Sequence, residues 1–271
     1  MSGLEVEGLT VRFGGHVAVN NLSLDAPLGR VTGLIGPNGA GKSTTFAAVS
    51  GTVRPSAGRV RLLDIDVSAR RPAARAQLGL GQTFQRTQLC ASLTVRENVA
   101  LGPEARAAGA NPWRQLVGRR ADVSRREAAV DRALEVCGIT DVEHRLVGSL
   151  SVGQRRLVEL ARVHAADYRV VLLDEPSSGL DPAETEGLGR VVTAMADDGL
   201  AILLVEHDMT LVMDVCGYLY TLDFGELIFA GTCEETRASA AVAAAYLGRK
   251  AGLEASEVAH ARAESGSGVG R

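Results

Sequence analysis

Lysine is almost missing from this chain. Its 271 residues include Lys42 and Lys250, and arginine supplies every other basic side chain. There is no basic excess either, because the formal net charge is -3, which disfavours a nucleic-acid-binding protein. No run of about 18 apolar residues is present, and the first residues do not resemble a signal peptide. Any role at a membrane is therefore expected to depend on a partner.

The cysteines also exclude some chemistry. None of the four lies in a C-x-x-C pair, so neither a zinc site nor a dithiol redox centre is indicated. The simplest interpretation is a set of reduced, mostly buried thiols in a cytosolic protein. They are Cys90, Cys137, Cys216 and Cys233.

Two kinds of apolar pattern predict the strands. Apolar side chains alternate along residues 4–24, which is typical of half-buried strands in an antiparallel sheet. Residues 31–35, 170–174 and 201–207 are instead apolar almost throughout, as strands of a parallel sheet covered on both faces must be. Polar residues, glycine or proline follow each of these runs, where a doubly wound sheet binds its ligands. A last strand pair is expected at 219–231, with the Asp-Phe-Gly at 223–225 as a hairpin turn rather than a kinase metal-binding triplet.

The region between these strands has a different pattern. Residues 86–166 are rich in alanine, arginine, glutamate and leucine, and Val130, Ala133 and Cys137 keep helical spacing. This predicts a helical subdomain inserted between strands of the core. One domain is expected over 1–248, and the polar segment 249–271 is expected to be a disordered tail.

A glycine-rich stretch gives the first chemical signal. Residues 36–44 read GPNGAGKST, after a predicted strand and before a predicted helix, which matches the phosphate-binding loop of nucleotide-binding proteins. The alternative, a glycine-rich turn with a chance lysine, does not explain the flanking elements. Backbone N–H groups of the loop would bind phosphate oxygens, Lys42 would reach the β- and γ-phosphates of ATP, and Ser43 would ligate Mg²⁺. Such a cradle admits a compact ammonium rather than a planar guanidinium. The candidate residues are Gly36, Pro37, Asn38, Gly39, Ala40, Gly41, Lys42, Ser43 and Thr44.

Two adjacent carboxylates end the second apolar run. Asp174 would hold Mg²⁺ through its water shell, and Glu175 would orient and partly deprotonate the attacking water. The alternative interpretation is a solvated helix cap before Pro176.

Other short motifs resemble those of the ATP-binding-cassette (ABC) ATPases. LSVGQ at 150–154 is similar to the LSGGQ signature of that family, with Val152 where glycine is usual. Gln85 resembles the Q-loop glutamine, which in the family contacts the metal and the water. Asp181 in SSGLD resembles the D-loop aspartate, and His207 resembles the switch histidine. Phe13 stands where the family places an adenine-stacking aromatic residue. Taken alone, Phe13 is more typical of a core residue and His207 of a structural one.

The resemblance implies a fold and an assembly. The fold would be α/β, with a P-loop NTPase core of mostly parallel sheet flanked by helices, an N-terminal antiparallel β subdomain and the inserted helical subdomain. In the family two subunits enclose two ATP molecules, so Ser151, Gly153 and Gln154 would face the ATP bound to the other subunit. Without that context, the same residues read as a capped helix with no ligand.

The resemblance also implies partners. The chain would be the ATPase of an importer, placed at the cytoplasmic face of the membrane by integral permease subunits and served by an extracytoplasmic solute-binding protein. VRFGG at 11–15, EHDMTLVMDV at 206–215 and AYLG at 245–248 resemble the branched-chain amino-acid importer ATPases, although branches that move urea or short amides share most of this sequence. The permease would contact Leu89, Cys90, Leu93 and Val95. A soluble, non-transport ATPase switch is the rival hypothesis, and a phosphotransferase lacks a recognisable second pocket.

Overall fold

The computed structural model describes residues 2–83, 89–110 and 120–246. Gln85 and the segment 249–271 therefore lie outside the described residues, and the predictions made for them stay predictions. The expected start of the helical subdomain, residue 86, also lies outside them, and the domain boundaries stay predictions. Within the described part, none of the helices combines the length and the hydrophobicity that a bilayer-spanning segment needs.

The N-terminal part forms an antiparallel sheet with strand order β2-β1-β4-β5. Its alternation changes phase between Val6 and Leu9, both of which are buried. The register of β1 against β2 shifts at this point, where Gly8 has φ 56°, so a bulge keeps both side chains on the core face. The strands are β1 (Ser2–Phe13), β2 (His16–Pro27), β4 (Ala57–Leu62) and β5 (Ile65–Asp66).

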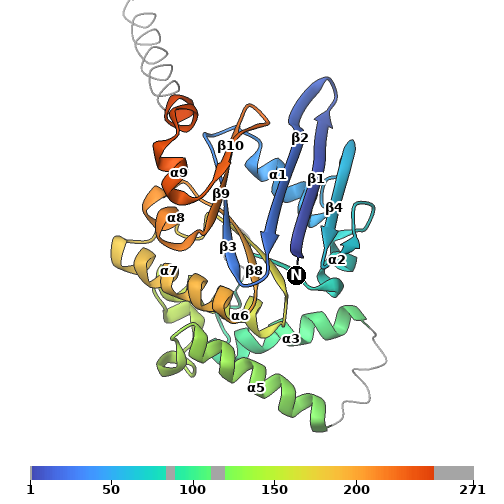
Figure 1. The fold of residues 1–271 in the computed structure, drawn as a ribbon. Coiled ribbons are helices and arrows are strands. Elements are labelled where there is room, and N and C mark those ends of the chain that lie inside the picture. The colour runs from blue at the N-terminus through green and yellow to red at the C-terminus, as the bar shows by residue number, and fades with distance from the viewer. Residues whose placement is uncertain (1, 84–88, 111–119, 247–271) are drawn as a thin grey trace, which may run out of the picture.

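A second sheet, with order β10-β9-β3-β8-β7-β6, forms the centre of the molecule (Figure 1). Its strands pair in parallel except for the antiparallel β9–β10 hairpin, which turns at Phe224 and Gly225 as predicted. The antiparallel N-terminal sheet and the mostly parallel core were thus predicted correctly. The strands are β3 (Arg30–Ile35), β6 (Leu80–Gln82), β7 (Val170–Asp174), β8 (Ala201–Val205), β9 (Tyr218–Asp223) and β10 (Glu226–Gly231).

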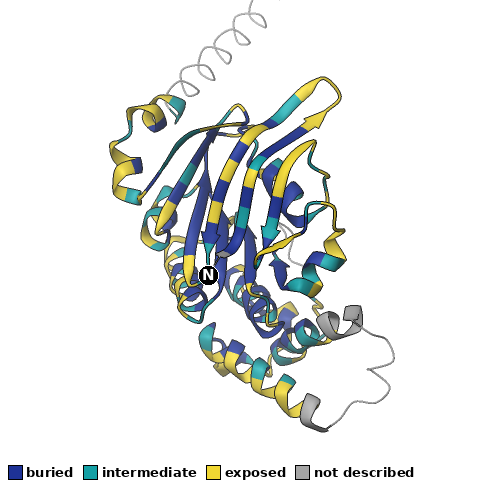
Figure 2. Ribbon diagram, turned by 45° about the vertical axis from the view of Figure 1, so that its right-hand side comes forward, coloured by how far each residue is buried: buried dark blue, intermediate teal, exposed yellow. Residues whose placement is uncertain are grey.

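Both faces of the central sheet are buried, which explains the continuous apolar runs. In β7, Val170 and Leu172 pack with the N-terminal sheet and α1, whereas Val171 and Leu173 pack with the helices on the opposite face. These strands are accordingly buried along most of their length in Figure 2. The carboxyl ends of β3, β7 and β8 lie side by side at one edge of the sheet, and the candidate site is built there.

The helices fall into two groups. Those that follow β6 and precede β7 lie together at the lower end of Figure 1, where α6 packs against α3 and α5. The others flank the two sheets. The α-helices are α1 (Lys42–Ser50), α2 (Pro72–Leu78), α3 (Val95–Ala110), α5 (Arg120–Val136), α6 (Val152–Ala165), α7 (Pro182–Asp197), α8 (Met209–Val215) and α9 (Cys233–Ala238), with short 3-10 turns at Thr140–Val142 and Val147–Ser149.

Candidate functional site

The glycine-rich loop joins the end of β3 to the start of α1. Gly36 has φ 145°, and a Cβ at that position would lie 2.2 Å from the backbone oxygen of Leu222, so no other residue fits without moving the β9 backbone. At Gly41, which precedes α1, φ is 104° and no side chain caps the helix. No side-chain cap therefore competes with an anion at the start of α1.

Lys42 lies inside this loop. Its residue is 7% exposed, and its Nζ donates hydrogen bonds to the backbone oxygens of Gly36 at 2.6 Å and Pro37 at 3.1 Å. A compact ammonium can contact both oxygens inside this tight loop. A planar guanidinium is wider, and its donors are held in a fixed arrangement that suits the loop less well. The geometry thus accounts for a lysine in a chain that otherwise uses arginine.

A cavity of about 360 Å³ opens at the loop. Phe13 lies at its edge on β1 and is 52% exposed, so the ring is a free apolar surface rather than a core side chain. The cavity therefore places an aromatic ring beside the glycine-rich loop. Its lining comprises Phe13, His16, Ala18, Asn38, Gly39, Gly41, Lys42, Ser43, Thr44 and Glu175.

Asp174 is the last residue of β7, and its carboxyl is poised for a cation. Burial raises the pKa of Asp174, the neighbouring Glu175 and Glu206 carboxylates raise it further, and the Lys42 ammonium opposes them. Its Oδ1 atom is buried with no hydrogen-bond partner. A hydrated Mg²⁺ would satisfy that oxygen and offset the carboxylate repulsion. The residues present therefore fit the metal.

Glu175 and His207 follow the ends of the neighbouring strands β7 and β8. Glu175 has φ 47° and is held there by a hydrogen bond from its N–H to the Val205 oxygen at 2.8 Å. Such strained backbone is common at functional sites. Its Oε1 lies 3.9 Å from Nδ1 of His207, whose side chain is 62% exposed. The two groups thus meet at the carboxyl edge of the sheet, although His207 itself is not among the lining residues of the cavity.

One detail of the strand prediction was wrong. The strand ends at Val205 rather than His207, because the fully buried Glu206 turns its carboxylate back onto the following backbone. Its Oε2 accepts N–H groups of His207 at 3.0 Å and Asp208 at 3.4 Å. Its Oε1 accepts the N–H of Ser177 at 2.7 Å. Sequence reasoning missed Glu206, yet a carboxylate within an apolar run was a usable signal.

The signature residues lie at the start of α6. The Ser151 side chain accepts the N–H of Gln154, and the Gln154 side chain accepts the N–H of Ser151, which together form a capping box. Val152 is exposed and Gly153 is buried. Asp181 caps α7 in the same way, through Glu184. None of Ser151, Gly153, Gln154 and Asp181 lines the cavity at the glycine-rich loop.

The segment expected to face a permease is only partly exposed. Cys90 is exposed and Leu89 and Leu93 are half-buried, but Val95 is fully buried in the core. The prediction that Val95 offers an exposed contact was therefore wrong, because the start of α3 packs inward. Asn98, which sequence reasoning did not single out, is buried and bonds to both the N–H and the oxygen of Cys90, at 2.8 and 3.0 Å.

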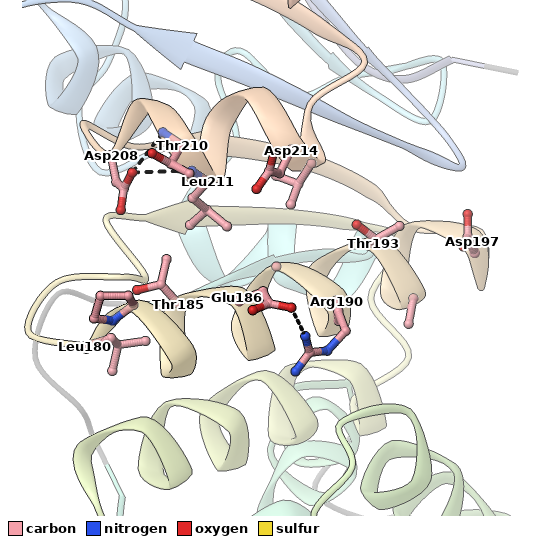
Figure 3. A pocket seen from close by; sticks show the side chains of 14 residues that line it. Leu180, Thr185, Glu186, Arg190, Thr193, Asp197, Asp208, Thr210, Leu211 and Asp214 are labelled. Carbon is pink, nitrogen blue, oxygen red and sulfur yellow. Dashed lines mark hydrogen bonds and ion pairs between the residues drawn. The ribbon is translucent and has the colours of Figure 1, made fainter.

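A larger hollow of about 830 Å³ lies between α7 and α8 (Figure 3). Carboxylates outnumber cations along it, and Arg190 pairs with Glu186 at 2.5 Å. Asp208 caps α8 through the N–H groups of Thr210 and Leu211. The hollow does not include the glycine-rich loop, and sequence reasoning did not predict it.

The fold and the site together define a class of protein. A glycine-rich loop between a parallel strand and a helix, with a carboxylate at the end of another parallel strand of the same sheet, is typical of a nucleotide-binding P-loop domain. A family model described as ABC transporter matches residues 19–178. The chain belongs to the ABC transporter family. It is accordingly an ATP-binding ATPase whose hydrolysis is coupled to transport.

Individual relatives agree. The high-affinity branched-chain amino acid transport ATP-binding proteins BraF of Pseudomonas aeruginosa and LivG of Escherichia coli are each 34% identical over 249 residues, covering 90% of this chain and 97% of theirs. The lipopolysaccharide export system ATP-binding protein LptB of Haemophilus influenzae is also 34% identical, over 92% of this chain and 99% of its own. A solved ATP-binding cassette of an ABC transporter, in its ADP conformation, has a TM-score of 0.78 and 27% identity, covering 92% of this chain and 99% of that one.

Proposed function

We propose that this chain is the motor subunit of an importer, and that it hydrolyses Mg²⁺-ATP to drive uptake of a small hydrophobic amino acid through a separate membrane permease. The observation that carries the ATP-hydrolysing part of the proposal is the meeting of three features at one sheet edge: the uncapped start of α1, the partnerless Oδ1 of Asp174, and the Glu175–His207 pair. Each is explained by a bound nucleotide with its metal. The transport part is supported by the related transport proteins.

The roles follow from where the residues lie. The loop from Gly36 to Thr44 binds the phosphates, and the exposed ring of Phe13 stacks on the adenine. Ser43 and Asp174 hold Mg²⁺, which neutralises phosphate charge when bound, and Gln85 is the third candidate ligand.

Hydrolysis needs a base and an orienting group. Glu175 accepts a proton from the attacking water, and His207 contacts the terminal phosphate at the edge of the same site. Glu206 acts through His207, because its carboxylate fixes the backbone N–H of the histidine.

The signature residues complete the site from a second copy or a paralogous subunit. Ser151, Gly153, Gln154 and Asp181 lie away from their own cavity, and in this proposal they contact the ATP of a partner. The assembled pair would sit at the cytoplasmic face of the membrane, where Leu89, Cys90 and Leu93 meet the permease, and an extracytoplasmic binding protein would deliver the solute.

Replacement of the proposed base tests this assembly. Glu175→Gln should slow hydrolysis by about 10²–10⁴-fold, the usual contribution of a general base, and should accumulate a dimer with Mg²⁺-ATP on size-exclusion chromatography. Adding Ser151→Ala should remove the dimer while leaving nucleotide binding by the monomer intact. A Glu175→Gln protein that stays monomeric at saturating ATP would contradict the proposal.

The solute needs a separate test, because an ATPase subunit does not touch the cargo. Relatives of equal identity include both branched-chain amino acid transport and lipopolysaccharide export proteins, and uptake of urea or a short amide is the alternative. Uptake of labelled leucine by vesicles that contain the assembled complex should require ATP. If such a complex hydrolyses ATP but moves urea or a short amide instead, the cargo is wrong and the motor role stands. A protein that never binds a membrane subunit would favour the soluble switch.

A further inference from the structure

One carboxylate lies at the start of two helices at once. Glu184 belongs to the first turn of α7, where its Oε2 accepts the N–H of Asp181 at 3.3 Å and closes the capping box of that helix. Its other oxygen, Oε1, accepts the hydroxyl of Ser151 at 3.1 Å. Ser151 and Glu184 are 33 residues apart in sequence. Their contact therefore joins the signature helix α6 to α7, the helix that follows the D-loop.

The fit around Glu184 is close. A Cβ at Gly153 would lie 2.5 Å from both the Cδ and the Oε1 atoms of Glu184, so the carboxylate lies directly against the backbone of the signature. A capping box on α7 needs only Asp181 and Glu184. The contact with Ser151 is an additional one, and the cap of α7 does not explain it.

The place that Glu184 occupies is one that attracts anions. The first N–H groups of a helix carry partial positive charge, and a serine hydroxyl adds a further donor. In the structure, the anion at the start of α6 is the protein's own carboxylate. According to the proposed function, the same hydroxyl must donate to the terminal phosphate of ATP bound by the partner subunit.

We infer that Glu184 competes with that phosphate for Ser151, and so sets the ATP concentration at which two subunits close. The inference rests on the proposed function, since it requires the signature to meet ATP from another subunit. Closure has to break the hydrogen bond between Ser151 and Glu184 and bring a phosphate close to a carboxylate. Two unit charges about 4 Å apart in water repel by about 1 kcal/mol, which is about a fivefold factor in an equilibrium constant.

The test compares two charge removals on one helix. Both variants are made in a Glu175→Gln background, in which hydrolysis does not remove the dimer. Glu184→Gln loses the negative charge, and its single amide oxygen can accept either the Ser151 hydroxyl or the Asp181 N–H. Glu186→Gln removes one negative charge two residues away, on an exposed side chain that pairs with Arg190. The measured quantity is the ATP concentration at half-maximal dimer, determined by light scattering.

The inference expects the Glu184→Gln protein to dimerise at about fivefold lower ATP, with a smaller gain at high salt because ions screen the repulsion. Glu186→Gln should lie within about twofold of its parent, since its carboxylate does not contact the signature and exposed pairs contribute little. If Glu184 merely held α6 and α7 together, the substitution would weaken the dimer instead. An unchanged or higher ATP requirement therefore overturns the inference.

Failure of the proposed function is recognisable in the same experiment. In that case the Glu175→Gln parent forms no dimer at any ATP concentration, and the inference falls with it. A dimer that forms in the parent but does not respond to Glu184→Gln contradicts the competition alone.

Discussion

Glu206 offers the sharpest test of how the carboxyl edge of the sheet is held. Its side chain is fully buried, and its two oxygens accept three backbone N–H groups, those of Ser177, His207 and Asp208. Ser177 follows β7 and the other two follow β8. One buried carboxylate therefore fixes the two chain segments that carry Glu175 and His207 relative to each other.

Glu206→Gln changes one atom and keeps the shape. The amide has a single acceptor oxygen, so it can retain the bond to Ser177 at 2.7 Å or those to His207 and Asp208 at 3.0 and 3.4 Å, but not both sets. The NH₂ group would then face buried donors. Each buried donor left unpaired costs about 1–3 kcal/mol, and the bond at 3.4 Å is weak, so we expect a loss of about 2–4 kcal/mol in the free energy of unfolding. This is a large part of the 5–15 kcal/mol that is usual for a domain.

Urea denaturation followed by circular dichroism measures that loss, and an unchanged slope would show that the denatured state is the same. Glu226→Gln is the matched control, because its carboxylate accepts a hydrogen bond from Asn20 at an exposed position, and it should change stability by less than about 0.5 kcal/mol. ATPase activity of Glu206→Gln should fall together with stability, since His207 is displaced. A Glu206→Gln protein as stable as its control would refute the reasoning.

Three further substitutions have definite expectations. Arg75→Leu removes a fully buried guanidinium that donates to the Ala48 and Val49 oxygens at the end of α1, and should cost about 3 kcal/mol in unfolding experiments; an unchanged midpoint would contradict this. Lys42→Arg should weaken binding of a fluorescent ATP analogue by at least about tenfold, because the guanidinium group is wider than the ammonium and does not fit the loop. Equal affinity would show that the loop tolerates arginine. The hydrogen bond from Arg132 lowers the pKa of Asp198 below 3.8 despite some desolvation, so Asp198 stabilises the fold above that pH and ceases to do so as pH falls below it. The wild type should therefore exceed Asp198→Asn by about 1 kcal/mol in the free energy of unfolding at neutral pH, and this difference should shrink in acid. A difference that grows in acid would contradict the expected pH dependence.

The sequence predicted those features that depend on local pattern. The runs at 31–35 and 170–174 match buried strands, because a strand covered on both faces has to be apolar at every position. The backbone shape of the glycine-rich loop also follows from local sequence. Gly36 and Gly41 adopt positive φ angles that few other residues reach, so glycine at these positions indicates such a loop.

Other features depend on which elements become neighbours, and no local pattern encodes that. Val95 reads as one apolar residue among several after the Q-loop, and only the packing of α3 shows that it is buried. Glu206 reads as the end of a strand until its carboxylate is seen to join two loops. Glu184 lies outside every motif that the sequence analysis named. Its contact with Ser151 exists because the N-terminal ends of α6 and α7 lie close together in space.

The two helix starts that are proposed to bind phosphate differ in a way that bears on the order of events. The start of α1 follows Gly41, and no side-chain hydrogen bond caps it. The start of α6 has Ser151 and Gln154 bonded to each other's backbone, and Glu184 bonded to the serine. A nucleotide that binds α1 meets no side-chain cap, whereas one that binds α6 must replace the hydrogen bonds of a capping box and of Glu184. The cradle should therefore fill first in each subunit, and the signature should engage only when a phosphate already fixed by another copy is brought against it.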